Sequence, residues 1–218
     1  MHVVRINVWK SRFSRQITTV RAYLWGSKFL LGMNKKFLLV LGLIVFGILT
    51  RFIFLIDGES ILPNFSAIGA IAIFGASYFK GASRWLIPFG IYWASDLILN
   101  NVVYAEYYES FQLMGNLWVY AAFILAGVIG FLVMKKKTLP RLAGASFGAA
   151  VIFFIISNFG VWAGGTMYPK DLGGLMTCYI AGIPFFWNTL LGNLIYGFIL
   201  FGVYEWVMNR SFLSLKLA

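Results

Sequence analysis

The chain has 218 residues, of which 61% are hydrophobic and 11% charged. A soluble domain of this length could not bury so much apolar side chain, so the composition predicts an integral membrane protein. One cysteine, Cys178, and one histidine, His2, leave too few ligands for a disulfide, a His/Cys metal site or a thiol catalyst. We therefore expect no enzyme activity, no metal and no cofactor.

The first 32 residues form a basic segment with six Lys or Arg and no Asp or Glu. Three interpretations remain open. Translation begins at Met33, which opens the ordinary membrane-protein start "MNKKFLLVLG"; or residues 1–32 are a basic helix on the cytoplasmic membrane surface; or they are an organelle-targeting sequence. No cleavage site of small residues follows the first apolar segment, so a removed signal peptide is not expected.

Apolar segments of about twenty residues, the length of a membrane-crossing helix, recur along the rest of the chain. They cover residues 37–56, 63–79, 85–103, 116–134, 142–161 and 186–207. The sequence therefore predicts an all-α integral membrane protein. Its domain at residues 33–210 is a compact bundle of six transmembrane helices, and residues 211–218 form a short cytoplasmic tail.

A further apolar piece at residues 174–185 contains Pro184 near its end. We interpret it as a short helix at the outer surface or as the beginning of a broken last span. A seventh complete crossing would not fit before Trp187.

The Lys and Arg residues orient the predicted spans. Of the 18 basic residues, all but Arg51 and Lys170 fall on one side of the six-span arrangement. An excess of Lys and Arg marks the cytoplasmic side, so both termini are predicted to be cytoplasmic and the protein to lie in a bacterial inner membrane. The net charge of +11 thus reflects topology. Nucleic acid is not an expected partner, because no soluble basic face is indicated.

Two opposite charges lie deep within the predicted spans. Arg51 follows "FGILT" in the first span, and Asp96 lies in "YWASDLILNN" of the third. A lone charge in hydrocarbon costs at least ~2.5–3.5 kcal/mol on insertion scales, so we expect the two side chains to pair. Alternatively, Arg51 extends outward to Asp57 or Glu59. The pair either locks two helices together or contributes to a ligand site.

Other polar and aromatic side chains occur at the same outer level of the bundle, whereas the inner half is almost wholly apolar. This asymmetry predicts a pocket open to the outside, with residues 162–174 as a lid. Hydrogen bonding between helices and interfacial aromatic belts are the structural alternatives. Glu205, near the inner end, is expected to be solvated at the interface. The candidate ligand-binding residues are Arg51, Asn64, Trp93, Asp96, Asn100, Asn158, Trp162, Tyr168, Asn188 and Asn193.

Small residues recur at four-residue spacing in several spans, as in Ala72 and Ala76. Such spacing lets helices approach closely. It usually indicates internal packing, but it also suits a face for a partner subunit.

Several segments together resemble a known family. They are "LTRF", "PNFSAIGAIAIFGASYF", "ASDLIL", "SNFGVWAGGTMYP" and "CYIAGIPFFWNTLLGN". Across about residues 47–200, the chain resembles a family of small bacterial membrane proteins of unknown function, common in Bacteroidetes-type bacteria and regarded as candidate transport proteins. That family is similar in turn to the substrate-binding (S) components of energy-coupling-factor (ECF) transporters.

The resemblance implies a six-helix subunit that captures a vitamin or related micronutrient near the outer face. It also implies a transmembrane coupling subunit and two ATPases as partners, with docking through an alanine-rich surface on an early helix. Ala72 and Ala76 would correspond to that surface, although they lie in the second predicted span.

The sequence thus predicts a membrane protein that binds a small polar solute for uptake. Two alternatives stay open: an accessory or structural subunit of a larger membrane complex, and a stand-alone secondary transporter. A cavity lined by Arg51, Asp96 and Asn158 would oppose the accessory interpretation, whereas a sealed outer half would favour it.

Overall fold

The computed structural model describes residues 35–56 and 59–208. The chain divides into two compact units, Met1–Gly42 and Leu43–Ala218. Of the first unit, only residues 35–42 are described. The predicted basic segment 1–32 and the tail 211–218 lie outside the described residues, as does Asp57.

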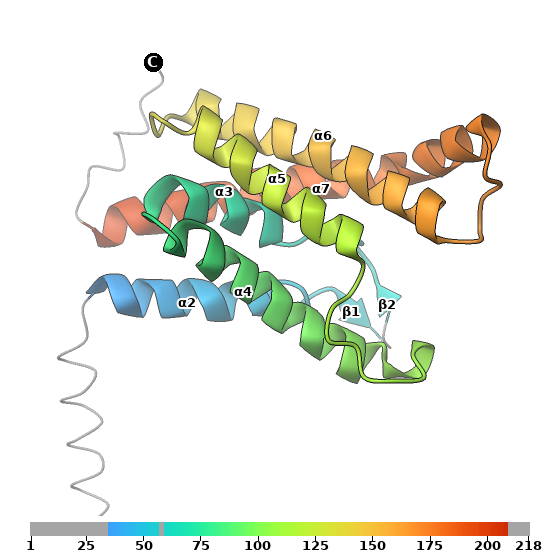
Figure 1. Cartoon of the computed structure of the whole chain (residues 1–218). Helices are drawn as coiled ribbons and strands as arrows, with labels where there is room; N and C mark the ends of the chain where they lie inside the picture. The colour runs from blue at the N-terminus through green and yellow to red at the C-terminus, as the bar shows by residue number, and fades with distance from the viewer. Residues whose placement is uncertain (1–34, 57–58, 209–218) are drawn as a thin grey trace, which may run out of the picture. The chain divides into compact units, whose positions relative to one another are not determined.

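The described elements are helices apart from one small hairpin (Figure 1). The hairpin pairs β1 (Leu55–Ile56) with β2 (Glu59–Ser60) in antiparallel register. The helices are α2 (Lys35–Leu49), α3 (Ile68–Tyr78), α4 (Ser83–Ile98) with a π-helical continuation (Leu99–Val103), a short 3-10 helix (Ala105–Tyr107), α5 (Leu117–Val133), α6 (Leu139–Gly164) and α7 (Leu172–Val207).

Three helical stretches are long and apolar enough to cross a membrane. They are Ser83–Val103, Leu139–Gly164 and Leu172–Val207, and α3 and α5 are shorter apolar helices. The predicted helical character is therefore confirmed, and three of the helical stretches have the length and apolar composition of a membrane span. The six crossings and the orientation of the termini stay predictions.

Local signals explain where several helices begin. The Asn116 side chain caps α5 by accepting a hydrogen bond from the Trp118 backbone N–H at 2.9 Å. Asp171 caps α7 in the same way through the Gly174 N–H at 2.7 Å. Pro140 lies in the first turn of α6, where its missing N–H is not needed.

The first two predicted spans are shorter helices than expected. The span at 37–56 ends as a helix at Leu49, and turns and the hairpin follow. The span at 63–79 becomes helical only at Ile68. Asn64 has a left-handed backbone with φ of 67°, which interrupts any helix that would start at Pro63.

The expected helix break near Pro184 is absent from α7. The helix runs without interruption for 36 residues, with Pro184 inside it. Proline removes only one backbone hydrogen bond, and α7 packs along α6 for much of its length. Residues 174–185 are therefore the first part of α7, neither a separate surface helix nor half of a broken span.

Helix α3 forms the core of the unit Leu43–Ala218. It packs against α4, α5, α6 and α7, and eight of its 11 residues are buried. Ala72 and Ala76 are each 2% exposed, so the structure uses them for internal packing. This corrects the expectation of an exposed partner surface on these residues.

Candidate functional site

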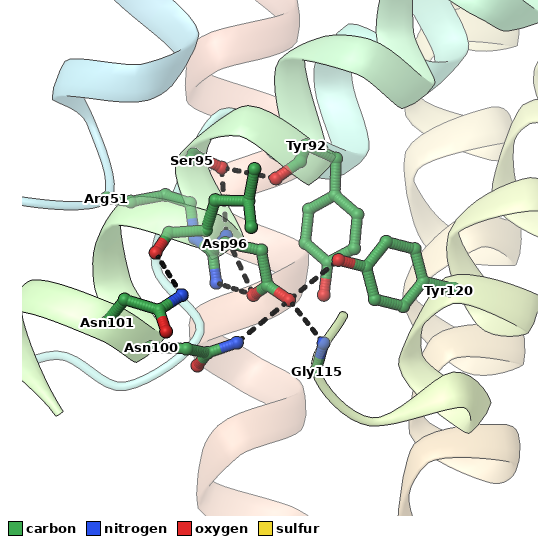
Figure 2. A network of polar contacts seen from close by, with 9 residues as sticks. Arg51, Tyr92, Ser95, Asp96, Asn100, Asn101, Gly115 and Tyr120 are labelled. Carbon is green, nitrogen blue, oxygen red and sulfur yellow. Dashed lines mark hydrogen bonds and ion pairs between the residues drawn. The ribbon is translucent and has the colours of Figure 1, made fainter. Parts of the chain in front are cut away.

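The predicted pair of buried charges is present. Nη2 of Arg51 lies 3.2 Å from Oδ1 of Asp96, and the two side chains are 18% and 8% exposed. Nη1 of Arg51 donates to Asp96 Oδ1 at 3.3 Å and to Ser95 Oγ at 2.9 Å. The guanidinium also lies 5.0 Å from the centre of the Tyr92 ring. The carboxylate of Asp96 therefore compensates the positive charge of Arg51. Figure 2 shows the two side chains in contact.

The second oxygen of Asp96 is bonded on the side away from Arg51 (Figure 2). Oδ2 accepts hydrogen bonds from the Tyr120 hydroxyl at 2.7 Å, the Gly115 N–H at 3.1 Å and Asn100 Nδ2 at 3.3 Å. Buried carboxylates are tolerated when they are paired and hydrogen-bonded in this way. The network ties the turn after α2 to α4, to α5 and to the loop that precedes α5.

A cavity of about 240 Å³ lies beside this network. Arg51 reaches it from the turn after α2, Asn64 from the segment before α3, and Asn193 from α7. Aromatic rings form much of the remaining wall, including Phe54, Phe65, Tyr92, Phe123 and Phe153. The cavity thus combines apolar walls with a few convergent polar groups, which is typical of small-molecule sites.

Three of the ten predicted ligand-binding residues line this cavity: Arg51, Asn64 and Asn193. Asn193 is 2% exposed and donates to the Ser146 carbonyl at 3.3 Å. Asp96 and Asn100 do not line the cavity. Asp96 accepts hydrogen bonds from Arg51, which does line it, and Asn100 donates to Asp96.

The other five predicted residues do not line the cavity, and four of them donate side-chain hydrogen bonds to backbone carbonyls. Trp93 Nε1 donates to the Leu113 carbonyl at 3.0 Å, and Asn188 Nδ2 to the Pro63 carbonyl at 3.0 Å. Asn158 Nδ2 donates within its own helix to the Phe154 carbonyl at 2.8 Å. Asn158 therefore serves helix structure, and the expectation that it lines the pocket is corrected.

The segment predicted to be a lid, residues 162–174, makes hydrogen bonds within itself. Trp162 Nε1 donates to the Pro169 carbonyl at 2.8 Å, and Lys170 Nζ contacts the Trp162 and Gly165 carbonyls. Neither Trp162 nor Tyr168 lines the cavity. The loop between α6 and α7 thus does not cover the cavity in this conformation.

Sequence reasoning missed several polar groups of the cavity wall. They are Thr50, Ser66, Tyr92, Tyr104 and Thr189. Three of them are sequence neighbours of predicted residues, since Thr50 precedes Arg51, Tyr92 precedes Trp93 and Thr189 follows Asn188. Hydroxyl groups are common in membrane helices, so their presence alone does not distinguish a cavity wall from helix packing.

Thr50 joins the end of α2 to the start of α3. Its side chain donates to the Gly47 carbonyl at 2.9 Å and accepts from the Ala67 N–H at 3.1 Å, and the residue is 1% exposed. We predict that Thr50→Val lowers the free energy of unfolding by about 1–3 kcal/mol, because a buried N–H loses its acceptor. The measurement is an SDS titration followed by maleimide labelling of Cys178, which is 2% exposed.

Thr50→Ser is the matched control for this prediction, since serine keeps the hydroxyl. Equal unfolding curves for Thr50→Val and the native chain would contradict the proposed role of the hydroxyl.

Glu205 is buried at the far end of α7. It is 3% exposed, which corrects the expected interfacial solvation. Its Oε1 accepts a hydrogen bond from the Tyr78 hydroxyl, and its Oε2 has no hydrogen-bond partner among the described residues. The contact joins the ends of α3 and α7. In the part of the chain that the structure describes, no three His, Cys, Asp or Glu side chains gather to hold a metal.

Comparison with known families adds one match, to a family of unknown function, DUF6580, over residues 32–215. The chain belongs to the DUF6580 family. No curated protein and no solved structure matches it. The cavity residues and the Asp96 network all lie within the DUF6580 match, whereas residues 1–31 precede it.

Proposed function

We propose that this DUF6580 protein is a multi-pass protein of the bacterial inner membrane that binds a small solute for uptake. In this proposal the chain crosses the membrane six times with both termini in the cytoplasm. The supporting observation is the cavity of about 240 Å³ with Arg51, Asn64 and Asn193 in its wall.

The chemistry of the wall favours a solute with one polar end and an apolar or aromatic body. Both Nη atoms of Arg51 are directed to Asp96, so the charge of the guanidinium is largely offset. Among the side chains that the structure describes, none accepts a hydrogen bond from its Nε–H, which in this proposal is offered to a carbonyl or carboxylate oxygen of the solute. The aromatic rings would pack on the rest of the solute.

Energy coupling follows the S-component resemblance in this proposal. A transmembrane coupling subunit and cytosolic ATPases would drive release of the solute into the cytoplasm. Because Ala72 and Ala76 are buried, docking of those partners would use another surface.

The test is native mass spectrometry of the full chain extracted gently from its membrane. We expect one small molecule per chain, lost in Val119→Phe, because Val119 lines the cavity and a phenyl ring would fill it. Val161→Phe is the matched control, since Val161 is 42% exposed on α6 and lies outside the cavity lining. The absence of a bound molecule in native and control chains, or its retention in Val119→Phe, would contradict the proposal.

An accessory-subunit role is the second candidate, and one observation favours it. Asp96 accepts five hydrogen bonds from protein groups alone, so the charged pair needs no ligand to be stable. A cavity lined by Arg51, Asp96 and Asn158 would have opposed this role. The observed cavity is lined by Arg51 but by neither Asp96 nor Asn158. Stoichiometric co-purification of a membrane subunit, with no small molecule, would select this role.

A further inference from the structure

A second hollow lies between α4 and α5, on another side of Phe123. This groove has a volume of about 210 Å³ and includes Ala72, Trp85, Phe89, Phe123 and Gly127 in its wall. Phe123 lines both the groove and the cavity of the candidate site. Leu86 and Ile124 stand at the groove with exposed fractions of 66% and 46%. Such exposure of large apolar side chains is expected where a helix meets lipid.

Arg84 is the one charged residue of the groove lining. Its Nε donates to the Phe79 carbonyl at 3.3 Å, and its guanidinium lies 4.4 Å from the centre of the Phe131 ring. These contacts hold the side chain in place at the groove. Among the described residues, no acidic side chain pairs with Arg84, and its Nη hydrogens have no acceptor. The guanidinium is therefore positioned to bind an anion.

The position of Arg84 in the fold indicates where that anion comes from. Arg84 lies in the first turn of Ser83–Val103, one of the three stretches that could cross a membrane. The first turn of a spanning helix lies at the level of lipid headgroups. Phe89, five residues further along α4, lies about 7.5 Å further along the helix axis at 1.5 Å per residue. The groove thus places the guanidinium of Arg84 at the level of the lipid headgroups and an apolar wall at the level of the acyl chains.

We propose that this groove binds one anionic phospholipid. Its phosphate binds the Nη groups of Arg84, and an acyl chain lies against Leu86, Phe89 and Ile124. A zwitterionic lipid is disfavoured, because its own cation competes with Arg84 for the phosphate. The site is separate from the proposed solute cavity and does not depend on it.

The first test uses the full chain in nanodiscs of equimolar phosphatidylglycerol and phosphatidylcholine, followed by native mass spectrometry of retained lipid. We expect one phosphatidylglycerol per chain. In Arg84→Gln its retention should fall about fivefold, the effect of one basic residue near a lipid headgroup. Lys80→Gln is the matched control, because Lys80 precedes the same helix but lies outside the groove lining. Equal retention of the two lipids, or equal retention by Arg84→Gln and the native chain, would overturn the proposal.

A second pair of variants tests the apolar part. Ile124→Trp should fill the exposed mouth of the groove and reduce lipid retention, whereas Leu125→Trp, on an exposed neighbouring position outside the lining, should not. Both replacements are at surface positions, so folding should be preserved. Equal retention in the two variants would contradict a site in the groove.

A third arm separates a lipid from a free phosphate ester. Glycerol 3-phosphate, added in excess, should not displace the retained phosphatidylglycerol, because it brings no acyl chain to the apolar wall. Full displacement by glycerol 3-phosphate would show that the site recognises the phosphate alone and would overturn the lipid assignment.

Discussion

Arg51→Met is expected to lower the free energy of unfolding by about 3–5 kcal/mol, the usual result of removing one partner of a buried ion pair. The Asp96 side chain is 8% exposed, so its carboxylate would remain buried without a cation. Its bonds to Tyr120, Gly115 and Asn100 would persist but could not replace the lost charge. The measurement is SDS-induced unfolding of the full chain in detergent, with labelling of buried Cys178 as the readout.

The double variant Arg51→Met/Asp96→Asn distinguishes a charge effect from a loss of packing. Asparagine keeps an acceptor oxygen for Tyr120 while both charges are gone, so more than half of the lost stability should return. Destabilisations that simply add in the double variant would contradict direct coupling of the two residues. Because Arg51→Met is expected to destabilise the fold, a binding assay on Arg51 variants alone would not distinguish loss of solute binding from unfolding.

Gly130→Ala is expected to lower the free energy of unfolding by about 1–3 kcal/mol, the usual cost of overpacking a tight contact. A Cβ atom at Gly130 would lie 2.7 Å from the Cα of Ile73 on α3. Backbone atoms cannot move aside as a flexible side chain can, so α3 and α5 would have to separate. The shift should appear in the same SDS titration.

Gly144→Ala on α6 is the control for this prediction. A Cβ there meets no atom within 4 Å, so only the higher helix propensity of alanine acts and stability should be unchanged or slightly raised. If Gly130→Ala were as stable as Gly144→Ala, close packing of α3 on α5 would not determine the stability of the bundle.

Apolar length predicted the positions of α4 and α5 well, although only α5 begins with a side-chain cap. The spans predicted at 116–134 and 85–103 correspond closely to α5 and to α4 with its π-helical continuation. The end of α2 was not predictable in this way, because "FIFLI" continues the apolar pattern beyond Leu49. There the hydroxyl of Thr50 bonds Ala67, a contact between segments that no local pattern contains.

For the candidate site, the sequence predicted how far along its helix each residue lies, but not the direction in which its side chain points. Two lone opposite charges at similar depth had few other partners, and this is why the Arg51–Asp96 pair could be predicted. Depth does not fix how a helix is rotated about its axis. Asn158 therefore turns toward Gly182 of α7 and bonds its own helix, whereas Asn193 reaches the cavity wall.

The shortness of α3 has a consequence for how the protein enters a membrane. Eleven residues rise about 16 Å, roughly half of the ~30 Å hydrocarbon layer. Such a segment is too short to be retained in the bilayer as an independent span. Its almost complete burial means that protein, rather than lipid, finally surrounds it. We therefore expect α3 to be inserted together with α4 as a helical hairpin, and to reach its final depth only after α5, α6 and α7 have been synthesised.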